Sequence, residues 1–211
     1  MVKVIIADDH KMFREGLKQI LREAPDIAVI DEAGSGQEAL NKIYNSDFDL
    51  LILDISMPGL SGLDVLKELK ANKSRLSVLI LSMYPEEQYA LRAIKMGASG
   101  YITKASASDE LIGAIRKISA GGTYISSSIA EKLLFSLKGD AEKLPHEALS
   151  NREYQIFNMI ASGKTTSQIA DELCLSIKTI STYRSRILDK MNMKSNAELI
   201  HYAVKHNLIE H

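Results

Sequence analysis

The sequence predicts a protein of two parts, an α/β domain with a doubly wound parallel sheet and a small all-α domain after it. Two observations support this prediction. Through residues 1–120, short runs rich in β-branched residues alternate with apolar residues at helical spacing. That alternation is typical of a parallel sheet with helices on both faces. From Leu149 onward the spacing is helical throughout, which indicates a separate helical domain.

The first domain is expected to span residues 1–121. Its five strands are expected at 2–7, 27–33, 49–54, 77–82 and 100–103, and helical spacing recurs over 11–23, 61–70, 86–96 and 108–118. Right-handed crossovers then favour a flavodoxin-like (βα)5 sheet with the strand order 2-1-3-4-5. The pair Gly121-Gly122 closes the last of these helices.

Residues 122–145 are expected to form a linker that contains one short helix. The helix is expected over 126–137, because Ile129, Leu133 and Leu137 are spaced by four residues. The stretch KGDAEKLP that follows is polar and rich in turn formers, as linkers are.

Residues 146–211 are expected to form the second domain, with four short helices. Ser150 is followed three residues later by Glu153, which is a capping-box pattern at a helix start. The expected helix ends at Gly163. Ser176 is expected to cap the third helix.

Composition narrows the function classes. The 211 residues are 45% hydrophobic and 25% charged, with a net charge of −1, so bulk charge does not indicate a nucleic-acid partner. No apolar run is long enough for a membrane span, and a cytoplasmic location is expected. The single cysteine, Cys174, excludes an internal disulfide and a site with several cysteine ligands. We expect Cys174 to be a small core residue.

The stretch DLLILDISMPGLSG ends a buried strand in a carboxylate, Asp54. Taken alone, Asp54 could simply begin a turn. Asp8 and Asp9 follow the first strand, however, and the expected strand order places that strand beside the third. Carboxylates held close together require a cation, and an all-oxygen set suits Mg²⁺. A carboxylate beside such a metal can act as the nucleophile of a phosphoryl transfer.

Two further strand ends fit this chemistry. Ser82 ends the fourth strand and can hydrogen-bond a phosphoryl oxygen, and Lys104 follows the fifth strand and can supply a positive charge. Either residue alone is more often structural or solvated. The coincidence of all these residues at the carboxyl ends of strands is what favours a site.

The motifs IIADDH, LLILDISMPGLSGLDVL, LILSM and GASGYITK resemble, in order and spacing, the receiver domain of a bacterial two-component response regulator of the NarL/FixJ type. The resemblance implies that Asp54 accepts a phosphoryl group from the phosphohistidine of a sensor histidine kinase. It implies Mg²⁺ ligands at Asp8, Asp9, Asp54 and the backbone carbonyl of Ser56. It also implies a switch pair, Ser82 and Tyr101, and a salt-bridging lysine, Lys104.

The stretch TTSQIADELCLSIKTISTYRSRILDKM has the outline of a helix-turn-helix. Ile169, Ala170 and Leu173 are expected to pack on Ile180. The exposed face of the third helix would carry hydroxyls and cations suited to bases and phosphates, namely Lys178, Ser181, Thr182, Ser185 and Arg186. The alternative is the exposed face of an ordinary helical bundle.

Residues from LSNREYQ to NAELI resemble the LuxR-type DNA-binding domain throughout. The resemblance implies that Ser181, Thr182 and Ser185 read bases and that Thr179 and Lys190 contact phosphate. The pair Thr166-Ser167 departs from the Asn-Lys that is frequent in the family. The departure removes a cation, so we expect a shallow dependence of DNA affinity on salt.

The resulting expectation is a phosphorylation-controlled transcriptional regulator that is not an enzyme. Its expected partners are double-stranded DNA, a sensor histidine kinase, a second copy of the chain and, as a further candidate, RNA polymerase, with no membrane partner. We expect phosphorylation to draw Ser82 inward, with Tyr101 following, and so to promote dimerisation or release of the recognition helix.

Two alternative functions would use similar residues. A haloacid-dehalogenase-like phosphatase needs a second acid two residues after the nucleophile, where this chain has Ser56. A receiver-like scaffold that binds DNA without phosphorylation stays open.

Overall fold

The computed structural model describes residues 1–72, 75–137, 144–206 and 208–209. These residues form two compact units, Met1–Leu133 and Leu134–His211. Residues 138–143 of the expected linker lie outside the described residues. None of the described helices combines the length and the apolar character that a membrane span requires.

The N-terminal unit contains a five-stranded parallel sheet in the order β2-β1-β3-β4-β5, as the sequence predicts. The strands are β1 (Val2–Ala7), β2 (Ile27–Ala33), β3 (Leu50–Asp54), β4 (Ser77–Ser82) and β5 (Gly100–Thr103). All five residues of β3 are buried, which explains its unbroken apolar sequence.

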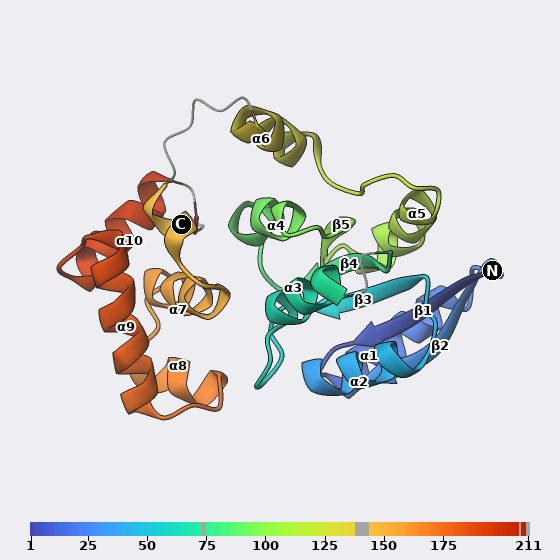
Figure 1. Ribbon diagram of the computed structural model, residues 1–211, viewed down its shortest axis with the longest axis horizontal. Coiled ribbons are helices and arrows are strands. Elements are labelled where there is room, and N and C mark those ends of the chain that lie inside the picture. The colour runs from blue at the N-terminus through green and yellow to red at the C-terminus, as the bar shows by residue number, and fades with distance from the viewer. Residues whose placement is uncertain (73–74, 138–143, 207, 210–211) are drawn as a thin grey trace. The chain divides into compact units, whose positions relative to one another are not determined.

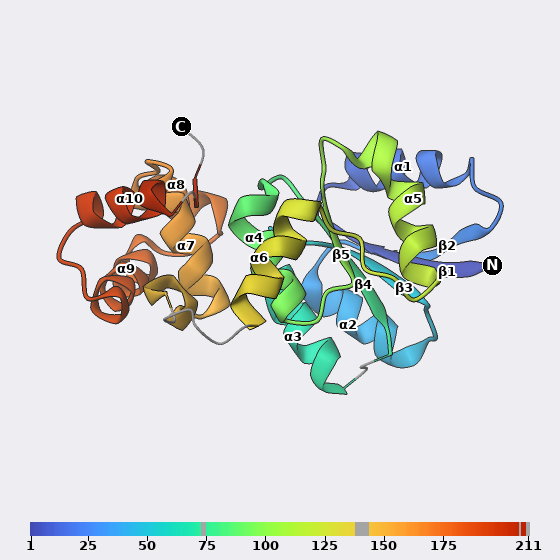
Figure 2. The same ribbon diagram turned by 90° about the horizontal axis from the view of Figure 1, so that it is seen from above.

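Helices cover both faces of this sheet (Figure 2). Helices α1 (Lys11–Leu21) and α5 (Ala107–Ser119) pack together on one face, and their apolar residues share one core cluster with alternate residues of the strands. The opposite face is covered by α2 (Gly36–Asn45), α3 (Gly62–Asn72) and α4 (Glu86–Lys95). Helix α2 lies between β2 and β3, where the apolar spacing of the sequence predicted no helix range. Because the helices lie on the two faces, they leave uncovered the edge of the sheet at which the carboxyl ends of the strands meet.

Helix α6 (Ser127–Leu137) occupies the stretch where a short helix is expected. Its residue Ile129 is buried. Between α5 and α6 the chain runs along the free edge of β5, where Tyr124 forms an isolated parallel bridge with Gly100. No local sequence pattern indicates this extra edge contact.

The C-terminal unit is helical, as predicted (Figure 1). After a 3-10 turn at Pro145–Ala148 come α7 (Asn151–Ala161), α8 (Thr166–Glu172), α9 (Ile177–Met191) and α10 (Asn196–Lys205). Ser150 and Glu153 form the predicted capping box, and the Ser176 hydroxyl accepts a hydrogen bond from the Thr179 amide at the start of α9. Helix α9 packs against α7 and α8, which gives the helix-turn-helix arrangement.

The turn between α8 and α9 corrects one prediction. Cys174 is exposed, with a left-handed φ of 53°, and is therefore not a core residue. The backbone amides of Cys174 and Leu175 close the end of α8 by donating to the carbonyls of Asp171 and Ala170. Cys174 is the left-handed residue that ends α8, and the apolar residue before it, Leu173, is the one that is buried in the core.

Candidate functional site

The register of the sheet brings two carboxylates together. Ala7 on β1 pairs with Leu53 on β3, so Asp8 and Asp54 follow side by side at the carboxyl ends of these strands. Both residues are buried, with 1% of their surface exposed. Asp9 points further outward, with 28% of its side chain exposed. Asp8, Asp9, Asp54 and Lys104 are called the acidic pocket below.

Lys104 joins the two buried carboxylates. Its Nζ lies 2.6 Å from Asp8 Oδ2 and 2.8 Å from Asp54 Oδ2, and its side chain is 5% exposed. Burial raises the pKa of Asp54, although the Lys104 ammonium opposes that shift. Burial works against the charge on Lys104, but Asp54 and Asp8 outweigh it and raise the pKa of the ammonium. Lys104 is therefore a fixed positive charge inside the pocket.

Backbone amides bind both carboxylates, and the amide of His10 donates to Asp8 Oδ1 over 2.8 Å. The amide of Ser56 donates to Asp54 Oδ1 over 3.1 Å. Arg14, a buried residue of α1, donates from Nη1 to the Asp8 carbonyl oxygen over 2.6 Å and also lies 3.4 Å from a carboxylate oxygen of Glu32. Arg14 thus ties the end of β1 to α1 and β2. The sequence reasoning did not find Arg14, since only its place on the buried face of α1 distinguishes it.

His10 is a second residue that the sequence reasoning missed. It follows Asp9 directly, and its Nδ1 lies 2.8 Å from Asp9 Oδ1 and 3.3 Å from Asp8 Oδ1. One ligand atom from each of Asp8, Asp9, His10 and Asp54 falls within 4.8 Å of the others. The signal that could have found His10 is its position in the ADDH motif.

The two expected switch residues lie on neighbouring strands, Ser82 as the last residue of β4 and Tyr101 as the second residue of β5. The Ser82 hydroxyl accepts a hydrogen bond from the Tyr84 amide over 3.1 Å, and the Tyr101 hydroxyl donates to the Tyr84 carbonyl over 2.7 Å. Both side chains are fully buried. Burial raises the pKa of Tyr101, against a hydrogen bond with Ser82. Because Tyr101 already points inward here, its burial requires no inward step of Ser82.

The pocket suits a divalent cation. Asp8 Oδ2 is buried and, among the described residues, has no hydrogen-bond partner of good geometry, although the Lys104 ammonium lies beside it. The buried Ser56 hydroxyl likewise has no partner among them. Three carboxylates against one ammonium leave a net negative charge, and hard oxygen ligands match Mg²⁺. These residues therefore fit the ion.

The exposed face of α9 carries the expected DNA-contacting residues. Lys178, Ser181, Thr182, Ser185, Arg186 and Lys190 are exposed, and Thr179 is half-buried. Six residues of this helix and its cap, among them Lys178, Thr182 and Arg186, line a shallow groove of about 320 Å³. The Thr182 hydroxyl donates to the Lys178 carbonyl over 3.0 Å, and the Thr179 hydroxyl lies 2.8 Å from that of Ser176. These local bonds orient the two threonine side chains.

Lys190 has a partner within the C-terminal unit. Its Nζ lies 2.6 Å from Glu153 Oε2, and that same carboxylate oxygen accepts from the Ser150 amide in the capping box. Burial works against the charge on Glu153, but Lys190 and the Ser150 contacts outweigh it and lower the pKa of the carboxyl. Lys190 therefore links the end of α9 to the start of α7.

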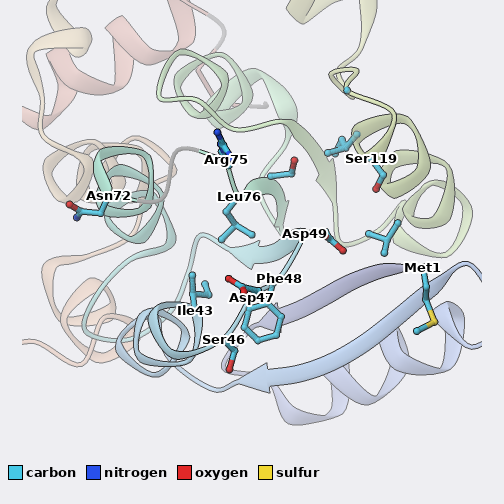
Figure 3. A pocket seen from close by; sticks show the side chains of 14 residues that line it. Met1, Ile43, Ser46, Asp47, Phe48, Asp49, Asn72, Arg75, Leu76 and Ser119 are labelled. Carbon is cyan, nitrogen blue, oxygen red and sulfur yellow. The ribbon is translucent and has the colours of Figure 1, made fainter.

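A further cavity lies away from these residues. It has a volume of about 780 Å³ and opens at the opposite, amino-terminal edge of the sheet, where it is lined by residues such as Asp47, Phe48, Asp49 and Arg75 (Figure 3). None of the predicted site residues lines this cavity.

Comparison with known proteins agrees with this arrangement. Residues 4–116 match the response regulator receiver domain, and residues 147–203 match the luxR family of bacterial regulatory proteins. The chain is 33% identical to the response regulator UvrY of Escherichia coli K12 over 99% of its own length and 96% of that protein. It is 36% identical to the response regulator GacA of Pseudomonas syringae pv. syringae B728a, over 100% and 99% of the two chains.

Solved structures agree as well. The Salmonella typhimurium response regulator RcsB is similar with a TM-score of 0.67 and 26% identity, over 97% of this chain and 98% of the other. A structure of an RcsB–DNA complex is similar with a TM-score of 0.60 and 26% identity, over 96% and 98%. Both family matches follow the order of the two folded units along the chain. The chain therefore belongs to the NarL/FixJ family of response regulators, in which a receiver domain precedes a LuxR-type helix-turn-helix domain.

Proposed function

We propose that Asp54 accepts a phosphoryl group from the phosphohistidine of a sensor histidine kinase and that this event controls binding of promoter DNA by α9. One observation carries the proposal. Lys104 holds Asp54 and Asp8 at the carboxyl edge of the sheet, next to the buried pair Ser82 and Tyr101. A nucleophile, a fixed cation and a hydroxyl donor are the groups that phosphoryl transfer to a carboxylate uses.

Each residue of the pocket has a part in the proposed transfer. Asp54 supplies the attacking carboxylate oxygen. Asp8, Asp9, Asp54 and the Ser56 carbonyl would hold Mg²⁺, which when bound offsets negative charge on the phosphoryl group. Lys104 and Ser82 would bind phosphoryl oxygens, Lys104 by its charge and Ser82 by its hydroxyl. Arg14 keeps the end of β1, and with it Asp8, in place.

The DNA contacts form the second half of the proposal. Ser181, Thr182 and Ser185 would meet base edges, while Thr179 and Lys190 would meet phosphate, with Lys178 and Arg186 adding charge. RcsB, which is similar in structure, has been solved in complex with DNA and as dimers on DNA. A dimer of this chain that reads two half-sites is the form we propose on promoter DNA, in the cytoplasm where DNA is present.

Phosphoryl uptake is the first test. The intact mass of the protein would be measured after incubation with a small phosphodonor and Mg²⁺. We expect a gain of one phosphoryl group that is lost in Asp54→Asn, retained in Asp47→Asn, and lost when Mg²⁺ is omitted. Asp47 is a matched control because it is an exposed aspartate at the opposite edge of the sheet.

DNA affinity is the second test. The affinity for promoter DNA would be compared with and without phosphodonor for wild type and Asp54→Asn. We expect phosphorylation to raise the affinity of wild type only. A folded wild-type protein that takes up no phosphate would instead support the scaffold that binds DNA independently of phosphorylation.

A further inference from the structure

The outer edge of β5 is covered by the chain that follows α5. In the strand order β5 has one neighbour, β4, so its other edge is free to pair. Tyr124 takes that place. The Tyr101 amide donates to the Tyr124 carbonyl over 3.0 Å, and the Tyr124 amide donates to the Ser99 carbonyl over 3.0 Å. We call residues 122–126 the edge segment. It satisfies backbone groups that an open edge would leave to solvent.

Side chains hold the edge segment on α5. The Tyr124 hydroxyl donates to Glu110 Oε2 over 2.9 Å, and Lys117 Nζ lies 5.6 Å from the centre of the Tyr124 ring. The ring also packs against the core cluster between α5 and the sheet. The edge segment is thus anchored by the ring and hydroxyl of Tyr124 and by a few backbone hydrogen bonds, which is a modest attachment compared with a disulfide or a full strand.

Gly100 makes room for this contact. A methyl group on the Gly100 Cα would lie 2.9 Å from the Tyr124 carbonyl oxygen and 3.0 Å from Tyr124 Cβ. It would also lie 3.0 Å from Ile118 Cδ1, the flexible end of a side chain. A larger residue at position 100 would therefore clash with the backbone of Tyr124.

The edge segment touches the switch at Tyr101. The hydroxyl of Tyr101 is bound to the Tyr84 carbonyl, and the Tyr84 amide is bound to the Ser82 hydroxyl beside the pocket. The backbone amide of the same Tyr101 is bound to Tyr124. Beyond Tyr124, the Ser126 hydroxyl accepts a hydrogen bond from the Ile129 amide at the start of α6. One residue of β5 thus joins the pocket to the beginning of the linker.

We propose that Tyr124 is a positioning residue for the switch and that the edge segment passes the state of the switch to the linker. The inference rests on the proposed phosphorylation of Asp54. When Ser82 turns to the phosphoryl group, the hydrogen bond from the Tyr84 amide is lost, and Tyr84 and Tyr101 shift together. The hydrogen bonds that hold the edge segment along β5 weaken in consequence, and the start of α6 loses its tie to β5 through that segment.

Amide exchange and DNA affinity in the full chain test this inference. Exchange of the Tyr101 and Tyr124 amides would be followed by NMR, with and without beryllofluoride and Mg²⁺ as a phosphoryl substitute. In wild type we expect the substitute to speed exchange of both amides by about tenfold, the effect of weakening one hydrogen bond. Gly100→Ala should exchange as fast without the substitute and respond no further. Gly113→Ala, a matched change where a methyl group meets nothing within 4 Å, should behave like wild type.

Tyr124→Pro is the second variant, because it removes the amide donor together with the ring and hydroxyl of Tyr124 and leaves the sequence of β5 unaltered. Tyr124→Phe keeps that donor and the ring and serves as its control. In Gly100→Ala and Tyr124→Pro we expect phosphoryl uptake at Asp54 to persist, while the gain in DNA affinity on phosphorylation falls from about tenfold toward none, within the usual range of coupling between sites. A merely structural edge cover would leave that gain unchanged.

The outcomes separate the inference from the function on which it rests. Wild-type protein that takes up phosphate with no change in exchange at Tyr101 and Tyr124 overturns the inference and leaves the proposed function standing. The inference also fails, and the proposed function again stands, if both variants keep the full gain in DNA affinity. Wild-type protein that takes up no phosphate overturns both.

Discussion

The end of β3, which carries Asp54, is packed against Gly62 so closely that the substitution Gly62→Ala should displace it. A methyl group on the Gly62 Cα would lie 2.0 Å from the Asp54 carbonyl oxygen and 2.9 Å from the Ile55 Cα. The Gly62 amide also donates to the Ile55 carbonyl over 3.0 Å, which fixes the start of α3 against the end of β3. The substitution would therefore act on the backbone that carries the Asp54 carboxylate.

The expected destabilisation follows from this geometry. Ordinary van der Waals contact begins at 3.4 Å, so the methyl group and the Asp54 oxygen would have to separate from 2.0 Å to that distance. Both partners belong to the main chain of a buried region, where no flexible side chain can give way. We therefore expect a loss of about 3 kcal/mol in the free energy of unfolding, at the upper end of the usual effect of overpacking. We also expect phosphoryl uptake to fall, because Asp54 would move away from Asp8 and Lys104.

Urea unfolding followed by circular dichroism would measure the loss, and intact mass would measure the uptake. The control is Gly113→Ala in the interior of α5, where a methyl group has free space. Alanine favours a helix interior over glycine, so the control should gain about 0.5–1 kcal/mol and keep full uptake. The same substitution thus has opposite expected signs at the two positions. A Gly62→Ala protein within about 0.5 kcal/mol of wild type would refute this reasoning.

Three further predictions concern single ion pairs and charges. Lys104→Ala leaves two buried carboxylates without their ammonium and should lower the free energy of unfolding by about 3 kcal/mol. In urea unfolding, excess Mg²⁺ should restore part of this lost stability. A loss of stability that does not depend on Mg²⁺ would contradict the metal assignment. Because the pKa of Glu153 is lowered in the folded state, its stabilisation is present above its unfolded pKa and is lost as the pH falls through its lowered folded pKa. Calorimetry of Glu153→Gln should show a weaker decline, and an identical decline would count against the pair with Lys190. Arg186→Ala should reduce the slope of log affinity against log salt by about 1, whereas the exposed Arg22→Ala should leave it unchanged.

The strands and their order could be predicted because the signals are local and repeated. Each strand is a short apolar run with a turn signal after it, and β3, buried along its whole length, has the plainest run. Asp8 and Asp54 then followed from the register of parallel strands, since residues that end neighbouring strands meet at one edge. The roles of the pocket residues depend on chemistry that geometry alone does not test, and they stay predictions.

The features that could not be predicted depend on contacts between distant parts of the chain. Arg14 reaches the Asp8 carbonyl only because α1 folds back over the end of β1. Lys190 meets Glu153 across two helices, and nothing in either local sequence marks the pair. Cys174 was predicted wrongly because an apolar residue was assigned to the core, while its backbone is the left-handed end of α8. Tyr124 lay in a stretch interpreted as linker, and only the fold brings its partners, the free edge of β5 and Glu110 of α5, to it.

The acidic pocket also contains an electrostatically unfavourable arrangement of buried charges. Asp8 and Asp54 are both 1% exposed and share the Lys104 ammonium, so the three groups together carry one excess negative charge. Burial raises the pKa of Asp54, and the charge of the neighbouring Asp8 adds to that shift. An apolar pair at these strand ends would pack without that penalty. The arrangement is therefore understandable as a binding site for a cation, whose charge would offset the excess and favour the ionised Asp54 carboxylate that the proposed transfer requires. The folded receiver should accordingly gain stability from Mg²⁺ in wild type and gain less in Asp54→Asn, which differs from wild type by a single oxygen-to-nitrogen exchange.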